Sequence, residues 1–251
     1  MVSSLCRYLP WDSEFFALRI GRVVPTRLRP EDLTSIRQWC VGDRIDCLYF
    51  LADADDSATS QLAQDDGFRL VDIRVTLERA NLHLTTEFAA PPNVLIRHWH
   101  PTDISALSDL AGRSHRNSRF YADPHFSRER ADALYRTWIE RSCAGDADAV
   151  LVAELPSGIA GYVSCHLREG MVGEIGLMAV NESARGAQLG RALCASALHW
   201  LGEHKARRVT VVTQGRNVSA QRVYQHLGFR TSLTELWFHR WFSKEGEPLR
   251  G

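Results

Sequence analysis

The residues best suited to chemistry lie between Gly173 and Leu193, in the segment G-E-I-G-L-M-A-V-N-E-S-A-R-G-A-Q-L-G-R-A-L. Its apolar first part predicts a strand that ends at Val180, and the apolar spacing that follows predicts a helix from Gly186 to His204. Backbone N–H groups at such a turn, together with the positive end of the helix, bind anions such as a pyrophosphate. Glycines at 186 and 190 let the backbone approach the ligand closely. The segment therefore predicts a phosphate-binding turn, although it contains neither G-x-x-x-x-G-K-[ST] nor G-x-G-x-x-G.

A second pattern follows about 30 residues later and reads N-x-x-A-x-x-x-Y-x-x-x-G-F. A tyrosine phenol, with an unperturbed pKa of about 10, is protonated at neutral pH and can donate its proton to a leaving group. Taken alone, Tyr224 is better explained as a half-buried aromatic side chain on an amphipathic helix, but its surroundings favour a general acid. The residues of the pattern are Asn217, Ala220, Tyr224, Gly228 and Phe229.

Together the two patterns resemble the acetyl-CoA site of the GNAT acetyltransferases, whose motif [RQ]-x-x-G-x-[GA] is matched by Arg185 to Gly190. The resemblance implies an α/β mixed sheet of the GNAT fold, acetyl-CoA as the donor substrate and no metal. It also implies that Asn217 contacts the cofactor and that Tyr224 lies beside the thioester sulfur. Backbone N–H groups at the end of the strand can stabilise the negative charge on the carbonyl oxygen. The expected acetyl-CoA contacts are Met178, Ala179, Val180, Arg185, Gly186, Ala187, Gln188, Leu189, Gly190, Arg191, Asn217 and Tyr224.

One residue of the turn departs from the family pattern. Where the family has its middle glycine, this chain has Gln188. Its side chain can crowd the pyrophosphate, or it can project away and leave the backbone donors usable. We expect acetyl-CoA binding to survive, with reduced affinity at most.

The general base is less defined than the acid. Glu174 can deprotonate the acceptor amine directly or through water, or it can be a solvated carboxylate at the start of its strand. Strand alternation predicts that Glu174, Gly176 and Met178 share one face, and that the residues between them share the other. An amino group on a sugar ring is less basic than lysine, so a chain of water molecules can also suffice.

Resemblance to one GNAT group extends beyond the donor site. The segments W-D-S-E-F-F-A-L-R-I-G (Trp11 to Gly21), S-R-F-Y-A-D-P-H-F (Ser118 to Phe126) and L-Y-R-T-W-I-E-R-S look like dTDP-fucosamine acetyltransferase and its relatives. Those enzymes acetylate the 4-amino group of a dTDP-4-amino-4,6-dideoxyhexose and carry a truncated GNAT-like N-terminal half. The resemblance implies a nucleotide-sugar substrate for this chain and a role in surface-polysaccharide or related sugar biosynthesis.

A short basic stretch is the candidate acceptor site. Arginine side chains suit a diphosphate, and aromatic rings beside them can stack on thymine. The alternative is a solvated loop that the arginines keep soluble. On resemblance only, Trp11 and Asp12 also border this site. The stretch comprises Arg113, His115, Arg116, Arg119, Phe120 and Tyr121, of which Arg119 and Tyr121, with Trp11, are the predicted substrate contacts.

The elements that position these residues fall into two blocks separated by Ala89-Ala90-Pro91-Pro92, which predicts domains at 1–90 and 93–251. The first block is expected to contain strands at 18–24, 46–52 and 68–78 with helices at 31–40 and 57–65. The second is expected to contain a strand at 94–99, a helix capped by Thr102, a helix at 128–142, strands at 149–154, 159–167 and 173–180, the helix at 186–204, a strand at 208–213, a helix at 218–227 and a strand at 230–242.

An internal similarity links the two blocks. The run from Cys47 and the run from Arg208 both predict strand, turn, helix, Gly-Phe-Arg and strand, with the glycines at 67 and 228. Any two strand-helix-strand units share such features, but the matched lengths favour a degenerate repeat. The first copy has Leu62 or Ala63 where the second has Tyr224, so it would have lost the chemistry.

Composition limits the alternatives. Thirty basic and thirty acidic residues leave no net charge to attract nucleic acid or an anionic membrane. Six scattered cysteines without a C-x-x-C pair indicate reduced packing thiols and a cytoplasmic protein. The strand at 230–242 can either pair in a homodimer or complete the sheet. Two other functions remain open, namely a GNAT that acetylates a protein N-terminus, a lysine or another small amine, and a non-catalytic CoA-binding module.

Overall fold

The computed structural model describes residues 5–80 and 91–242 of the 251-residue chain. The chain forms two compact units: unit 1 comprises Met1–Arg74 and Thr234–Gly251, and unit 2 comprises Val75–Leu233. The predicted boundary at Ala89 and Ala90 lies outside the described residues. The structure divides the chain elsewhere because two long strands, β4 (Arg69–Ala80) and β10 (Arg230–Trp241), each belong partly to both units.

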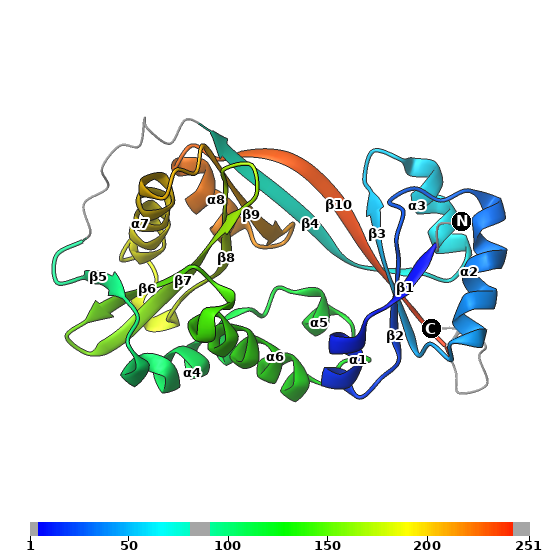
Figure 1. The fold of residues 1–251 in the computed structure, drawn as a ribbon, viewed down its shortest axis with the longest axis horizontal. Helices are drawn as coiled ribbons and strands as arrows, with labels where there is room; N and C mark the ends of the chain where they lie inside the picture. The colour runs from blue at the N-terminus through cyan, green and yellow to red at the C-terminus, as the bar shows by residue number, and fades with distance from the viewer. Residues whose placement is uncertain (1–4, 81–90, 243–251) are drawn as a thin grey trace. The chain divides into compact units, whose positions relative to one another are not determined.

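Unit 1 is a small sheet with helices against it (Figure 1). Its hydrogen-bonded strand order is β1-β2-β3-β10, with β2 parallel to β3 and β10 antiparallel to β3. The central strand β3 is buried along almost its whole length, which explains its continuous apolar sequence. The elements of this unit, besides β4 and β10, are β1 (Cys6–Tyr8), α1 (Pro10–Phe16), β2 (Ile20–Val23), α2 (Pro30–Gly42), β3 (Cys47–Asp53) and α3 (Ser57–Asp65).

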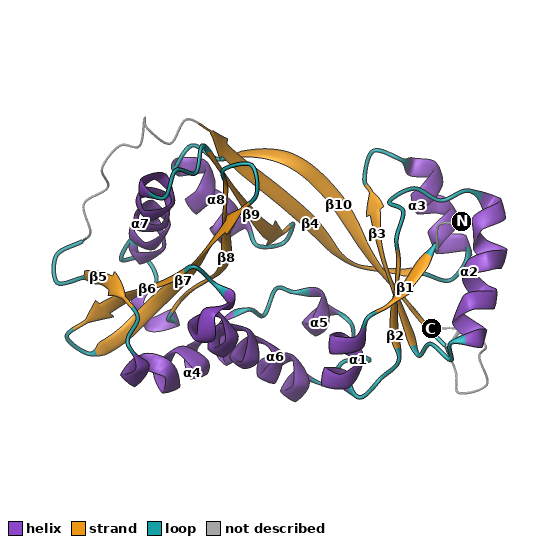
Figure 2. Cartoon of the chain, in the orientation of Figure 1, coloured by secondary structure: helices purple, strands orange, loops and turns teal. Residues whose placement is uncertain are grey.

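Unit 2 holds the predicted site residues other than Trp11 and Asp12. Its strand order is β10-β4-β9-β8-β7-β6-β5, with β5 to β8 antiparallel to one another and β8 parallel to β9. Helices α7 and α8 cover one face of this sheet, and α4 and α6 cover the other (Figure 2). The elements are β5 (Leu95–His98), α4 (Ile104–Ser114), α5 (Arg119–Ala122), α6 (Arg128–Arg141), β6 (Ala149–Leu155), β7 (Gly158–Arg168), β8 (Val172–Val180), α7 (Leu189–Glu203), β9 (Arg208–Gln214) and α8 (Val218–His226).

The predicted order of strands and helices is confirmed, with three differences. The short elements β1, α1 and α5 were not predicted, because three to seven residues carry too little periodicity. Thr102 was predicted as a helix cap, but the cap is His100, which precedes a 3₁₀ turn at Pro101–Asp103 and accepts from the backbone N–H of Thr102. Helix α7 begins at Leu189 instead of Gly186.

The internal similarity has a structural counterpart. Strand β3, helix α3 and strand β4 have 7, 9 and 12 residues, and β9, α8 and β10 have the same lengths. Gly67 and Gly228 both have the left-handed φ that ends a helix, +84° and +83°. The second set is displaced from the first by a constant 161 residues, from Cys47 to Arg208, from Ser57 to Val218 and from Arg69 to Arg230.

The long strand of each set completes the other unit. Strand β10, from the second set, pairs with β3 over Glu235 to Trp241, and β4, from the first set, neighbours β9. Strand β10 therefore lies between β3 and β4 in the sheet. Of the two roles predicted for it, completion of the sheet is the one observed.

A buried ion pair secures β10 within unit 1. The guanidinium of Arg240 on β10 bonds Asp66, which follows α3 and also pairs with Arg37 on α2. The side chains of Arg240 and Asp66 are only 4% and 1% exposed. Charges so far from water are tolerated only while they are paired.

Asp66→Asn therefore removes the partner of a buried cation. We expect unit 1 to lose about 3–5 kcal/mol of unfolding free energy, measured by urea denaturation. The neighbouring exposed Asp65, which accepts a hydrogen bond from Gln61, supplies the control: Asp65→Asn changes stability by about 0.5 kcal/mol at most. Equal effects of the two substitutions contradict the assignment.

Candidate active site

The two parallel strands β8 and β9 separate partway along their length. Their pairing runs from Val172–Arg208 to Ile175–Val211, whereas β8 continues to Val180 and β9 to Gln214. Residues beyond this point leave backbone groups on the edge of β8 that faces β9. Backbone donors need a partner when they are shielded from water, so this opening suits a ligand with an acceptor group.

The direction of the β8 donors follows from two hydrogen bonds. Leu177 N donates to Ser164 Oγ on β7 at 2.8 Å, and Asn181 N donates to Ala160 O at 2.8 Å. Successive residues of a strand point their N–H groups to opposite edges. The N–H groups of Met178 and Val180 therefore point away from β7, into the opening beside β9.

The register of β8 against β7 shifts between Val163 and Cys165, which face Met178 and Ile175. One intervening residue on β7 thus opposes two on β8, Gly176 and Leu177, which is the arrangement of a β-bulge. The hydroxyl of Ser164, which is fully buried, accepts from Leu177 N within the bulge.

Because of this bulge, the predicted faces of β8 are wrong. Glu174, Gly176 and Met178 were predicted to share one face and Ile175, Leu177 and Ala179 the other. Ile175 and Met178 instead both pack in the core against α7, while Leu177 and Ala179 pack in the core against α4 and α6. The extra residue at 176–177 reverses the alternation, which no pattern of apolar residues signals.

The turn before α7 has the geometry of an anion site. Gly186 adopts φ +84°, and α7 follows at Leu189. The N–H groups of Leu189 and Gly190 precede the first intrahelical hydrogen bonds and so have no partner within the helix. Ala187 is exposed in the same turn, and Arg185 pairs with Glu182 at 3.1 Å on the surface. The turn therefore presents backbone donors and a positive helix end to solvent.

Gln188 has a left-handed backbone conformation, which glycine adopts readily. It is the N-cap of α7 with φ 58° and ψ 13°, a left-handed conformation that costs a residue other than glycine some strain. Its side chain is exposed, and its Oε1 accepts from Arg191 Nη1 at 3.5 Å. Its carboxamide therefore points along α7.

Asn217 is the N-cap of α8. Its Oδ1 accepts from Ala220 N at 3.3 Å and from Ser219 Oγ at 3.1 Å. The oxygen is therefore committed to the helix, while the amide nitrogen is a donor that a ligand can use. This capping role accounts for an asparagine at this position even without a cofactor.

Tyr224 lies on α8 and is 4% exposed. Its ring contacts Phe229 at 5.7 Å between centroids, within the core that also contains Met178 and Val180 on β8. Burial, followed by the neighbouring Cys194, raises the pKa of its phenol well above the usual range. Tyr224 is therefore protonated at all physiological pH values, as a general acid at a leaving group must be.

Glu174 lies toward the other end of β8. Its Oε2 accepts from Arg168 Nε at 2.8 Å, and its side chain is 37% exposed. Four residues separate it from Met178, which is about 13 Å along a strand. The structure thus places this candidate base in a surface ion pair, away from the donors at 178 and 180.

Two residues of the predicted acceptor stretch are held by one carboxylate. Asp132 accepts from Arg116 Nη1 at 2.6 Å and from Tyr121 Oη at 2.7 Å. The Arg116 guanidinium also lies 4.9 Å from the centre of the Tyr121 ring. Arg116 and Tyr121 therefore contact each other as well as Asp132. The Tyr121 ring also stacks on the Tyr135 ring, with 6.3 Å between their centroids.

His115 was predicted as part of a basic stretch, and this is wrong. Its Nε2 lies 2.8 Å from Tyr162 Oη, and its ring stacks on Tyr135 at 4.4 Å with an interplanar angle of 16°. Burial lowers the pKa of His115 to about 4, so the imidazole is neutral at physiological pH. It adds no positive charge beside Arg113 and Arg116.

The other predicted acceptor residues lie on different elements. The Arg119 guanidinium lies 4.2 Å from the centre of the Phe120 ring, which is buried, and Arg113 bonds the carbonyl of Asp109. Trp11 belongs to unit 1, where it stacks on Phe15 at 5.2 Å. Asp12 lies beside it on α1.

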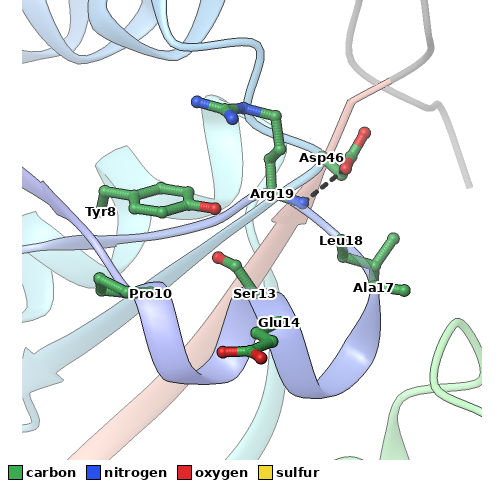
Figure 3. Close-up of a pocket in the computed structure, with 8 residues that line it drawn as sticks. All are labelled: Tyr8, Pro10, Ser13, Glu14, Ala17, Leu18, Arg19 and Asp46. Atoms are coloured by element: carbon green, nitrogen blue, oxygen red, sulfur yellow. Dashed lines mark hydrogen bonds between the residues drawn. The ribbon is translucent and has the colours of Figure 1, made fainter.

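A pocket of about 350 Å³ lies within unit 1 (Figure 3). The Arg19 guanidinium lies 5.0 Å from the centre of the Tyr8 ring, and Arg19 N donates to Asp46. The pocket contains none of the predicted site residues. It is lined by Tyr8, Pro10, Ser13, Glu14, Ala17, Leu18, Arg19 and Asp46.

Residues 5–80 and 91–242 lack two further kinds of feature. These residues contain no group of three or more His, Cys, Asp or Glu side chains that could bind a metal ion. They contain no helix with the length and apolar character needed to cross a bilayer.

Comparison with known proteins agrees with this geometry. Residues 111–229, which include the β8 edge, the turn and α8, match the model of the Acetyltransferase (GNAT) family. The chain therefore carries a GNAT acetyltransferase domain. A GCN5-related N-acetyltransferase from Sphaerobacter thermophilus has the same fold, with a TM-score of 0.66 at 17% identity over 93% of this chain and 75% of that one.

Three curated relatives are more similar to this chain in sequence than that structure is. The spore coat polysaccharide biosynthesis protein SpsD of Bacillus subtilis is 31% identical over 62% of this chain and 54% of its own length. The dTDP-fucosamine acetyltransferase of Escherichia coli O6:H1 is 34% identical over 55% of this chain and 60% of its own length. A mycothiol acetyltransferase of Salinispora arenicola is 28% identical over 84% and 64%. The chain thus spans less than two thirds of each relative's length.

Two residues at the site were missed by sequence reasoning. Ser164 orders the bulge of β8, and Tyr162 holds His115. A serine inside the apolar strand G-Y-V-S-C signals a buried hydrogen bond, but not its partner. The partner of Tyr162 is 47 residues away, so no local pattern reveals it.

Gln188→Gly tests whether the side chain at 188 obstructs phosphate binding. Because the carboxamide is directed along α7, we expect the dissociation constant for CoA, measured by calorimetry, to change by about threefold at most. A gain of about tenfold or more shows instead that the side chain crowds the ligand. Gln214→Gly, in the same unit at the end of β9, controls for a general effect of glycine.

Proposed function

We propose that this protein transfers the acetyl group of acetyl-CoA to the 4-amino group of a nucleotide-linked (dTDP) 4-amino-4,6-dideoxyhexose by direct attack. The observation that carries the proposal is the opened edge of β8, where the N–H groups of Met178 and Val180 face the gap beside β9. Tyr224 packs in the core on the same side as these two residues.

The donor half of the reaction follows from these groups. Met178 and Val180 N–H donate to the thioester carbonyl oxygen, and their effect grows as negative charge develops on it. The turn at Arg185 to Gly190 and the first turn of α7 hold the pyrophosphate through backbone N–H groups. Asn217 contributes its amide nitrogen to the cofactor. Tyr224 donates its phenolic proton to the departing thiolate.

The acceptor is assigned on the relatives. SpsD and dTDP-fucosamine acetyltransferase each match more than half of this chain, and their names refer to polysaccharide biosynthesis and to a dTDP-amino sugar. We assign Arg119, Tyr121 and Trp11 to the acceptor. Mycothiol acetyltransferase matches 84% of the chain and favours a second acceptor, the deacetylated precursor of mycothiol.

We further propose that residues 1–90 descend from a second copy of the GNAT unit that has lost its chemistry. At the constant offset between the two sets, Ala63 occupies the place of Tyr224 and Asp56 the place of Asn217. Asp56 still precedes its helix as the N-cap, but a buried alanine has no proton to donate.

The six free thiols support a cytoplasmic location for the enzyme.

Tyr224→Phe separates chemistry from binding. The ring that packs on Phe229 is retained, so CoA should raise the melting temperature as it does in the wild type. Turnover, followed by release of the CoA thiol, should fall about 10²-fold or more because the thiolate loses its acid. Tyr8→Phe, in unit 1, is the control and leaves turnover unchanged. Undiminished turnover in Tyr224→Phe removes the assigned role.

A panel of amines tests the acceptor. With equal acetyl-CoA, we expect kcat/KM to be highest for a dTDP-4-amino-4,6-dideoxyhexose, followed by the deacetylated mycothiol precursor, and lowest for a lysine peptide. A lysine peptide or a protein N-terminus that reacts fastest contradicts the sugar assignment. Stabilisation by CoA without turnover of any amine indicates a non-catalytic CoA-binding module.

A further inference from the structure

We propose that His115 is the base that removes the proton from the acceptor amine during acetyl transfer, and that Tyr162 orients it. This assignment rests on the acetyl transfer proposed above. It replaces Glu174, which lies in a surface ion pair, with a residue on the sheet face opposite Tyr224.

The position follows from the two faces of unit 2. Tyr224 belongs to the core beneath α7 and α8, together with Met178 and Val180. Tyr162 and Ala179 face each other across β7 and β8, and both pack in the core beneath α4 and α6. In the proposed mechanism the amine attacks from the α4–α6 face, opposite the acid and on the side of Tyr162, which holds His115.

The imidazole is held on two sides. Its Nε2 lies 2.8 Å from Tyr162 Oη, and its face stacks on Tyr135. In the productive tautomer Nε2–H donates to the Tyr162 oxygen, which leaves a lone pair on Nδ1. Within residues 5–80 and 91–242, Nδ1 has no hydrogen-bond partner and is not among the fully buried side-chain atoms that lack one, and His115 as a whole residue is partly exposed.

Four other titratable groups close to His115 or packed on this face are unsuited to the role. Asp132 is committed to Arg116 and Tyr121. Burial raises the pKa of the Tyr121 and Tyr162 phenols above their usual range, so both stay protonated. Burial likewise raises the pKa of Cys143 to about 11. A neutral imidazole with a free lone pair is the remaining proton acceptor among these groups.

The proposed acetyl transfer forms one bond, breaks one bond and moves two protons. The neutral amine nitrogen bonds to the thioester carbonyl carbon, and the carbon–sulfur bond breaks. The surplus proton of the nitrogen passes to Nδ1 of His115, while the sulfur takes the phenolic proton of Tyr224. The imidazolium then releases its proton to solvent and the phenolate regains one. The amine nitrogen becomes strongly acidic once it has attacked, so a weakly basic imidazole can accept its proton.

The test uses the full-length protein, acetyl-CoA and a dTDP-4-amino-4,6-dideoxyhexose. In His115→Ala we expect kcat to fall about 10²-fold, with an unchanged thermal shift by CoA. Added imidazole should restore part of the rate to His115→Ala in a saturable way, because a free base can enter the vacated position. Imidazole should not accelerate the wild type or His204→Ala, which removes a histidine stacked on Trp200 at 4.0 Å in the same unit.

Three results overturn the proposal: an unchanged kcat in His115→Ala, a loss that imidazole does not restore, or a comparable loss in Glu174→Gln. If His115→Ala does not fold, His115→Gln takes its place, with a loss of kcat at retained CoA binding as the supporting result and an unchanged kcat as the contradicting one. Tyr162→Phe should reduce kcat less than His115→Ala, since it removes the orienting bond only. A wild type that turns over no amine refutes acetyl transfer itself, which is a different outcome.

Discussion

Backbone hydrogen-bonding groups must find partners, and the separation of β8 from β9 creates a place where they do not. Pairing stops at Ile175 and Val211 while both strands continue. The bulge opposite Ser164 then sets which N–H groups point into the opening. Preorganised donors of this kind need no rearrangement when charge develops on a bound carbonyl. The turn before α7, Asn217 and Tyr224 all belong to elements that follow this opening along the chain.

The two similar sets of elements are interleaved in the fold. Each set of strand, helix and long strand gives its last strand to the other unit, so neither half of the chain forms a complete sheet by itself. The first set has Ala63 at the place of Tyr224, yet it keeps the helix-ending glycine at 67. The helix-ending glycine is thus present in both sets, whereas the tyrosine proposed as the acid is present only in the second. The buried pair of Arg240 and Asp66 links β10, from the second set, to the end of α3 in the first.

Much of this organisation could be predicted from sequence, because apolar runs and helix-ending glycines are local features of the sequence. The strands from 149 to 180, the helix of Tyr224 and the left-handed caps at Gly67 and Gly228 are examples. The faces of β8 could not be predicted, since a single buried hydroxyl at Ser164 shifts the register. Nor could the division into units, because strand pairing between distant segments has no periodic signature. His115 was misjudged for the same reason: its environment is made by Tyr135 and Tyr162, neither adjacent in sequence.

The central claim is that the opened edge of β8 binds a thioester carbonyl, and a crystal structure with acetyl-CoA tests it most directly. The account predicts the carbonyl oxygen about 2.7–3.1 Å from the backbone nitrogens of Met178 and Val180. It also predicts the sulfur beside the Tyr224 hydroxyl and the pyrophosphate at Arg185 to Gly190. A thioester bound away from β8, or a carbonyl that contacts no backbone N–H of residues 178–180, contradicts it.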